Sequence, residues 1–196
     1  MTIYRHFYLK SNAVTKPNIN LRDLPSAGRI DIVARCINSA FWLSNDIRRN
    51  VFFHTILHGE PNPPIYIRFE GEKMRKVSPD ERNIAIFIIK AIEKASDEEK
   101  ETTPGIFASK KDFKKFVEEN RDKEYYLMDE KGENIENIKF GEKTLFFLGD
   151  NKGLSEEEKE ILHKYGAIDV SIGEKSYLSS HCITIINWFL DKIERL

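Results

Sequence analysis

Residues 167–196 read AIDVSIGEKSYLSSHCITIINWFLDKIERL, and they contain a strand, a loop and a helix in direct succession. The apolar run at 167–172 predicts a short buried strand, and the polar residues at 173–177 predict a loop. Apolar residues then recur at helical spacing through 178–196, which predicts a closing helix. Its inward positions are Ile183, Ile186, Phe189, Leu190 and Ile193. A buried strand that leads into a long helix is typical of α/β folds.

The beginning of the closing helix is unusually polar. Ser179, Ser180, His181 and Cys182 occupy its first turn. The backbone N–H groups of a first helical turn have no partner within the helix, so they can bind a small polar ligand. We therefore expect a site where the loop 173–177 meets the helix.

The preceding segments extend the same alternation of strands and helices. Strands are predicted at 125–128 and 144–149, and a helix at 155–165 begins with a capping box formed by Ser155 and Glu158. This order predicts an α/β fold with a largely parallel sheet flanked by helices.

Ligands of parallel sheets collect at the carboxyl ends of the strands. We therefore expect a site in the loops after Leu127, Leu148 and Ile172. Gly149 and Gly153 allow a ligand to approach the backbone closely, although on spacing alone a tight turn is the commoner interpretation.

The N-terminal half contains its own set of predicted elements. They are a strand at 3–9, a helix at 27–43, a hairpin of strands at 51–57 and 65–69, and a helix at 79–94 that Ser78 caps in a capping box with Glu81. Residues 97–105 read as an exposed link, and 110–120 as a short charged helix.

Length and composition indicate one domain, residues 1–196, which can bury about 70% of its unfolded surface. Two cysteines are too few for a disulfide framework, which favours a reducing compartment. No apolar run is long enough to span a bilayer, and the N-terminus lacks a signal-peptide pattern. We expect a cytoplasmic protein without membrane contact.

The two halves of the chain differ in charge. Residues 1–96 carry 15 lysines and arginines against 9 acidic residues, whereas residues 97–196 carry 16 against 23. Nine of the arginines fall in the first half. Arginine is the better ligand for phosphate oxygens, so this half could face a polyanion. From charge alone, an uneven surface is the simpler explanation.

Several familiar sites are not supported. The chain has no G-x-G-x-x-G after a strand and no P-loop motif, which disfavours Rossmann and P-loop enzymes. His54 and His58 lack the glutamate of H-E-x-x-H, and we expect no metal site. Cys182 stands at a helix start, where a thiol pKa can be lowered, but without a partner pattern for a nucleophile. Packing against a ligand is the better interpretation of Cys182.

Four segments together resemble one known family. They are RHFYLKSNA at 5–13, CINSAFWLSNDIRRNVFFHTILHGEPNPP at 36–64, FLGDNKGL at 147–154 and SIGEKSYLSSHCITIINWFLD at 171–191. The last two resemble the SPOUT class of knotted methyltransferases. All four joined are similar to the archaeal tRNA pseudouridine N1-methyltransferase family, over essentially the whole chain.

This resemblance implies a SPOUT-type α/β knot, in which the segment around 176–190 passes through a preceding loop. It implies a cofactor, S-adenosylmethionine, held by residues 97–196, with residues 1–96 on the substrate side. The implied cofactor-binding residues are Leu127, Gly149, Ile172, Gly173, Glu174, Lys175, Ser176, Tyr177 and Cys182. Leu127, like Leu148 and Leu178, would equally suit the core of any α/β protein.

The resemblance also implies that the substrate is N1 of pseudouridine 54 in the T-arm of tRNA. N1 must lose a proton, and Asp46, beside Arg48 and Arg49, is our candidate base. The alternative, a simple turn at Asn45 and Asp46, is slightly favoured. Tyr177 is a second catalytic candidate, with core packing as its alternative.

The expected partners are tRNA and a second copy of the chain. The resemblance implies that Arg29, Arg48 and Arg49 contact RNA phosphates, and that a homodimer builds each site between its subunits. Asp46 and Arg48 would then serve the partner's cofactor. The candidate interface aromatics are Phe41, Trp42, Phe52, Phe53 and Trp188, for each of which core burial is an equal alternative.

Two other functions remain open at this point. The enzyme could methylate a ribosomal RNA pseudouridine or a ribose hydroxyl. It could also be a non-catalytic RNA-binding assembly factor, which would have no reason to bind the methyl donor.

Overall fold

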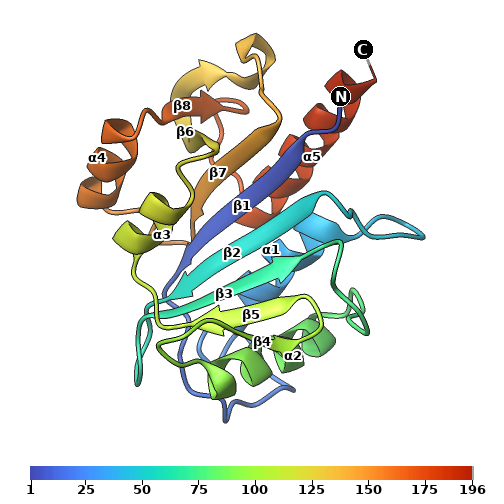
Figure 1. Cartoon of the computed structure of the whole chain (residues 1–196), viewed down its shortest axis with the longest axis vertical. Helices are drawn as coiled ribbons and strands as arrows, with labels where there is room; N and C mark the ends of the chain where they lie inside the picture. Colours follow the sequence, from blue (N-terminus) through green and yellow to red (C-terminus); the bar gives the residue numbers. More distant parts are fainter. Residues whose placement is uncertain (196) are drawn as a thin grey trace.

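The fold is one eight-stranded sheet covered by helices on both faces (Figure 1). The computed structural model describes residues 1–195. Its elements are β1 (Tyr4–Ser11), α1 (Ile30–Phe41), β2 (Val51–Leu57), β3 (Ile65–Glu70), α2 (Glu81–Lys94), β4 (Lys100–Thr103), β5 (Ile106–Ser109), α3 (Phe113–Glu119), β6 (Glu124–Asn134), a short 3-10 turn (Ile135–Asn137), β7 (Lys143–Gly149), α4 (Glu156–Lys164), β8 (Ile168–Ser171) and α5 (Ser179–Glu194). The end of the predicted closing helix, Leu196, lies outside the described residues.

The strands follow the order β4-β5-β3-β2-β1-β7-β6-β8. The five strands from β2 to β8 are parallel, and β3, β5 and β4 extend the sheet in antiparallel fashion. The predicted α/β architecture is therefore confirmed. The sheet is mixed because short links such as the β2–β3 hairpin reverse the chain, whereas parallel neighbours need crossover helices.

Two details of the sequence prediction are wrong. Residues 97–105, expected to be an exposed link, contain β4, because Pro104 and Gly105 turn the chain so that Lys100, Glu101 and Thr103 pair with β5. The cap of α2 is Asp80 rather than Ser78, since the Asp80 side chain accepts the backbone N–H of Asn83. The capping box of Ser155 and Glu158 at α4 is confirmed.

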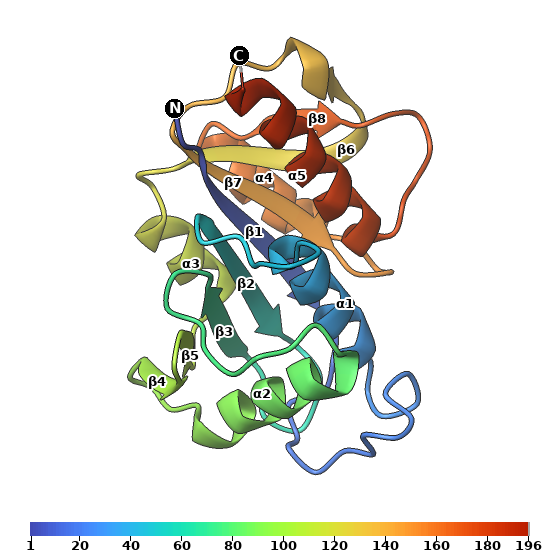
Figure 2. The same cartoon turned by 90° about the vertical axis from the view of Figure 1, so that its right-hand side faces the viewer.

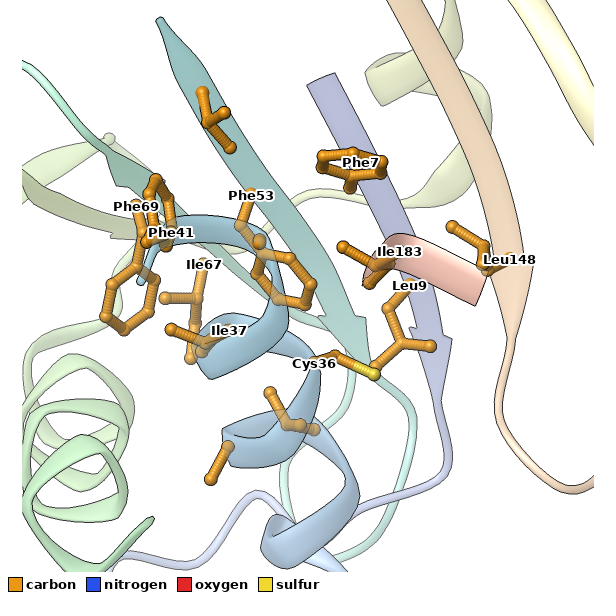
Figure 3. Close-up of a cluster of buried hydrophobic side chains, with 14 of the residues drawn as sticks. Phe7, Leu9, Cys36, Ile37, Phe41, Phe53, Ile67, Phe69, Leu148 and Ile183 are labelled. Carbon is orange, nitrogen blue, oxygen red and sulfur yellow. The ribbon is translucent and has the colours of Figure 1, made fainter. Parts of the chain in front are cut away.

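Strand β1 divides its side chains between two cores. Phe7 and Leu9 point toward α1, α2 and α5, whereas Tyr8 points toward α3 and α4, as the two-residue period of a strand requires. Figure 3 shows Phe41 of α1 and Ile183 of α5 in the first core. Phe41 and Phe53 are fully buried there, so for these two residues core burial, the equal alternative to an interface position, is confirmed.

An ion-pair cluster fastens α5 to the amino end of β1. The Arg5 side chain is 1% exposed, and its guanidinium donates to the Asn187 carbonyl oxygen at 3.1 Å and to the Asn187 Oδ1 at 3.0 Å. It also pairs with Asp191 and Glu194, both at 2.9 Å. A buried charge is tolerated only when it is paired, so the guanidinium needs these groups of α5.

Arg48 strengthens the same cluster. Its guanidinium binds both carboxylate oxygens of Asp191 at 2.7 Å, in the two-pronged geometry that arginine favours. The two arginines hold the pKa of Asp191 below its ordinary value against the opposing effect of burial, the largest single influence. The loop before β2 is thus tied to α5.

Among residues 1–195, no helix combines the length and apolarity that a membrane span needs.

We predict that the double change Asp191→Asn and Glu194→Gln lowers the free energy of unfolding by about 3–5 kcal/mol, because it leaves the buried Arg5 charge unpaired. Arg5→Met should lower the free energy of unfolding by a smaller amount. The carboxylates that pair with Arg5 are partly hydrated, and Asp191 still pairs with Arg48 in this variant. Urea unfolding measures both values. Glu160→Gln, on exposed α4, is the control. Losses below about 1 kcal/mol for both variants would show that apolar packing alone holds α5.

Candidate functional site

The carboxyl ends of β6, β7 and β8 surround a cavity of about 450 Å³. Figure 2 shows the loop from β8 to α5 descending toward the loop that leaves β7. Both loops line the cavity, together with the residues that follow Leu127 in β6. A cavity of this size suits a cofactor-sized ligand.

Eight of the nine predicted cofactor-binding residues line this cavity. They are Leu127, Gly149, Ile172, Gly173, Lys175, Ser176, Tyr177 and Cys182. Glu174 instead lines a neighbouring hollow beside Trp188. The topology thus joins residues from three strand ends that are up to 55 positions apart in the sequence.

Apart from Lys175, sequence reasoning missed the charged residues of the cavity. Asp129 and Glu130 follow the predicted strand 125–128 directly, which was the available signal, and Lys152 and Lys159 face them from the β7–α4 segment. Ser176 holds the pKa of the Glu130 carboxyl below its ordinary value. Both residues line the cavity, so the β6 segment and the β8–α5 loop meet there.

Gly149 has no room for a side chain. A Cβ built on it would lie 2.4 Å from the Gly153 Cα and 2.9 Å from the Leu154 nitrogen, both backbone atoms. The turn that brings Gly153 so close is fixed by Asp150, whose carboxylate accepts the Asn12 backbone N–H at 2.7 Å. The tight turn, the commoner interpretation of these glycines, is confirmed, and Gly149 and Gly153 both line the cavity. Close approach of a ligand to their backbone stays a prediction.

The beginning of α5 closes the cavity. The Ser179 hydroxyl donates to the carbonyl oxygen of Gly149, which joins α5 to the end of β7. Cys182 lies one turn further on, with its Sγ 3.8 Å from the Tyr177 carbonyl oxygen. Burial raises the pKa of Cys182 to about 11, so the thiol is a packing group rather than a nucleophile.

A second groove, of about 360 Å³, adjoins the cavity. The two share Asp150, Ser176, Tyr177 and Ser179 as lining residues. Its other side is formed by the beginning of α1, where Arg29 and Arg35 lie. Tyr177 is 46% exposed between the two spaces, so it can contact molecules in both.

Asp31 holds the two arginines of the groove. Its carboxylate is buried, and Oδ2 lies 2.9 Å from Arg35 and 3.4 Å from Arg29. Oδ1 has no hydrogen-bond partner in the described part of the chain. Arg29 has a left-handed backbone with φ of 66°, which aims it differently from a helical residue. Arg35 was not predicted as a site residue.

The structure places the other predicted residues away from this cavity. Asp46 forms a turn after α1, accepting the Ile47 N–H at 2.8 Å, as the favoured alternative predicts. Arg48 is engaged with Asp191, whereas Arg49 is about half exposed and donates to the Gly71 carbonyl at 3.1 Å. Residues 30–41 of α1, a length of about 18 Å, separate Asp46 from Arg29.

Comparisons with known proteins agree with this arrangement. A family model described as "Putative SAM-dependent RNA methyltransferase" matches residues 4–195. A tRNA (pseudouridine(54)-N(1))-methyltransferase of Methanococcus aeolicus is 45% identical, over 95% of this chain and 97% of its own. The enzyme of that name from Methanocaldococcus jannaschii is 44% identical over 96% and 97%.

A solved structure shows the same fold. Nep1 of Archaeoglobus fulgidus, bound to S-adenosylhomocysteine, superposes with a TM-score of 0.70 over 100% of both chains at 14% identity. At this identity the likeness concerns the fold alone.

We predict that iodoacetamide labels Cys182 at pH 8 about 100-fold more slowly than an unperturbed thiol. A pKa of about 11 rather than 9 leaves about 100-fold less thiolate at that pH. Peptide mass spectrometry over time measures the rate. Cys36, which is fully buried with a pKa raised to about 12, is the internal reference and should react more slowly still. Labelling of Cys182 at the rate of a free thiol would contradict its desolvation.

Proposed function

This chain belongs to the tRNA (pseudouridine(54)-N(1))-methyltransferase family, and we propose from this membership that it methylates N1 of pseudouridine 54 in tRNA, with S-adenosylmethionine as donor. The observation that carries the proposal is the 44–45% identity to relatives of that name over nearly the full length of the chain. The cavity at the ends of three strands supports it. Its substrate supports a cytoplasmic location.

The cavity residues fit the proposed cofactor. The backbone at Leu127, Gly149 and Ile172 lines the cavity and can bind a flat base, each hydrogen bond contributing about 1 kcal/mol net. Asp129 and Glu130 suit the hydroxyls and the positive charges of such a ligand. When bound, S-adenosylmethionine supplies an electrophilic methyl group.

The proposal includes a trefoil knot around residues 176–190. The family resemblance supports it, as does the Ser179–Gly149 hydrogen bond, which holds the closing segment against the end of β7. The proposal also assigns residues 97–196 to cofactor binding and 1–96 to the substrate side. The cavity lining supports the first assignment, since its residues run from Leu127 to Cys182.

The groove beside the cavity is the proposed path of the RNA. Arg29 and Arg35 can bind phosphates there while Asp31 keeps them in place. The target nucleotide, turned out of its stack, would enter past Tyr177. Tyr177 can stack on the base or hydrogen-bond it.

A homodimer completes the proposed site. Asp46 follows the end of α1 that is remote from the groove and does not line the cavity of its own chain, so the proposed base at each site is Asp46 of the partner subunit. The exposed apolar residues Leu43, Leu178 and Trp188 lie on or beside α1 and α5, and they support an interface on this face. Arg48 then contributes by tying the Asp46 loop to α5, and Arg49 remains available for phosphate.

The chemistry asked of the protein is positioning and proton transfer. N1 of pseudouridine carries a proton that must leave as the N–C bond forms. An Asp46 carboxylate within hydrogen-bond reach would accept it, which contributes about 100- to 10,000-fold in rate. Holding N1 in line with the methyl group supplies much of the remainder.

Methyl transfer to defined transcripts tests the function. We expect transfer to tRNA that contains pseudouridine 54 and none to the same tRNA with uridine 54. Transfer to ribosomal RNA alone, or to a ribose hydroxyl, would favour the alternative substrates. Tight RNA binding without affinity for the methyl donor would favour an assembly factor.

We predict that Gly149→Val weakens S-adenosylmethionine binding at least about tenfold, because the new Cβ would collide with the Gly153 backbone and displace the loop. Isothermal calorimetry measures the affinity. Gly166→Asn is the control. Gly166 has a φ of 86°, which asparagine tolerates better than other side chains do, and it lies outside the cavity lining. The crowding found at Gly149 is absent there, because the Gly166 Cβ position has no atom of residues 1–195 within 4 Å. Unchanged affinity in Gly149→Val would mean that this loop is not part of the site.

Asp46→Asn should lower kcat by about 100-fold or more while leaving cofactor affinity unchanged, since it removes the proton acceptor and keeps the shape. Asp97→Asn, in another exposed loop, is the control. A normal rate would remove Asp46 from the mechanism.

Mixing the two inactive variants tests the shared site. A heterodimer of Asp46→Asn and Gly149→Val subunits contains one cavity with an intact Asp46 of the partner subunit. Random mixing should therefore recover about a quarter of the wild-type rate. If Asp46 acts within its own chain, the mixture stays inactive.

A further inference from the structure

A hollow of about 280 Å³ lies at the opposite end of the sheet from the cofactor cavity. Its floor is formed by side chains of β1, β2 and β3 on the α3 face, close to the amino ends of β1 and β2. The hollow shares no lining residue with the cavity or with the arginine groove.

Three buried side chains of the floor form a hydrogen-bonded chain, which we call the relay. The His6 Nδ1 lies 2.9 Å from the His54 Nε2, and the His54 Nδ1 lies 2.7 Å from the Tyr66 hydroxyl. His6 is 7% exposed, and the other two are almost completely buried. The remaining ring nitrogen, His6 Nε2, has no hydrogen-bond partner among residues 1–195, and His6 lines the hollow.

The protons along the relay are linked, because each neutral histidine ring donates from one nitrogen and accepts at the other. When the Tyr66 O–H donates to His54 Nδ1, His54 Nε2–H donates to His6 Nδ1, and His6 Nε2–H is left as a donor that faces the hollow. This is the direction that the proposed site requires. Donors aligned in this way polarise one another.

The surroundings of the relay are positively charged. Burial, followed by the charges of Lys123, Lys143 and Arg68, lowers the pKa of His6 to about 3, with Asp122 opposing them. The His6 ring is therefore neutral at pH 7. At His54 the pKa is lowered by burial and then by His6, Arg68, Lys123 and Lys111. The lining itself holds three cations, Arg68, Lys111 and Lys123, and two carboxylates, Glu99 and Glu119, so one positive charge is in excess. An excess of positive charge favours an anion.

The cations of the hollow differ in how they are engaged. Lys111 pairs with Glu119 at 2.6 Å and Glu99 at 3.3 Å, and Arg68 pairs with Glu99 at 2.6 Å. Lys123 lines the hollow together with His6, and its ion-pair partner Asp122 lies outside the lining.

A structural role explains part of this arrangement. His6 stacks on Phe52 with ring centroids 4.3 Å apart and an interplanar angle of 2°, which accounts for the ring's packing. This stacking does not explain why His6 Nε2 has no hydrogen-bond partner among the described residues. A metal site is not supported, because the described residues hold no cluster of three or more His, Cys, Asp or Glu side chains.

We propose that this hollow binds a phosphate group, with His6 Nε2–H and the Lys123 ammonium as its donors. The phosphate can come from the backbone of bound tRNA or from free phosphate in solution. Only the first source rests on the proposed function. The site lies about four residues of β1, or roughly 13 Å, from the strand ends that line the cavity.

Nuclear magnetic resonance of the His6 ring nitrogens tests the proposal on the unmodified protein. We expect His6 to be neutral with its proton on Nε2, and this signal to shift saturably with inorganic phosphate but not with sodium chloride at matched ionic strength. A parallel titration with tRNA distinguishes the sources. A shift with tRNA identifies a backbone phosphate, and a shift with inorganic phosphate alone identifies the free ion. No shift with either, or a proton on Nδ1, would overturn the proposal.

Substitutions give an independent reading. Lys123→Gln should abolish the saturable shift, whereas Lys114→Gln, an exposed lysine on α3 outside the lining, should leave it intact. If tRNA is the source, Lys123→Gln should also reduce the salt dependence of tRNA binding by about one phosphate contact. Methyl transfer measured on the same protein distinguishes failure of the proposed function from failure of the phosphate site. A protein that binds phosphate but transfers no methyl group would contradict only the proposed function. Equal behaviour of the two lysine variants would contradict the site.

Discussion

The guanidinium of Arg5 constrains the rest of the structure. It lies on the central strand β1, almost without contact with water, and such a charge demands carboxylates and carbonyls around it. Among the described residues, Asn187, Asp191 and Glu194 of α5 supply them. The register of α5 across the sheet is therefore set at its carboxyl end, and Arg48 reinforces it.

Because α5 is fixed at that end, its beginning falls at the carboxyl ends of β6, β7 and β8. Ser179 bonds the end of β7, and the residues just before it separate the cavity from the arginine groove. Tyr177 is common to both spaces. The same helix thus supports the methyl-donor side and the substrate side of the proposed reaction.

Periodicity and turn chemistry predicted the elements that depend on local signals. The strands 51–57 and 65–69 and the Ser155 cap follow from neighbouring residues, and resemblance located most of the cavity lining. Arg48 shows the limit: its pairing with Asp191 spans 143 positions, which no local pattern encodes. Strand β4 was not predicted, because its sequence is rich in charged residues and its strand conformation depends on pairing with β5. The relay of His6, His54 and Tyr66 likewise exists only through strand register.

A crystal structure of the protein with S-adenosylhomocysteine tests the central claim most directly. The account predicts density for the ligand between Leu127, Gly149 and Ile172, with Ser179 still bonded to Gly149 and α5 still paired to Arg5. Density at another place, or an empty cavity at saturating ligand, would contradict it.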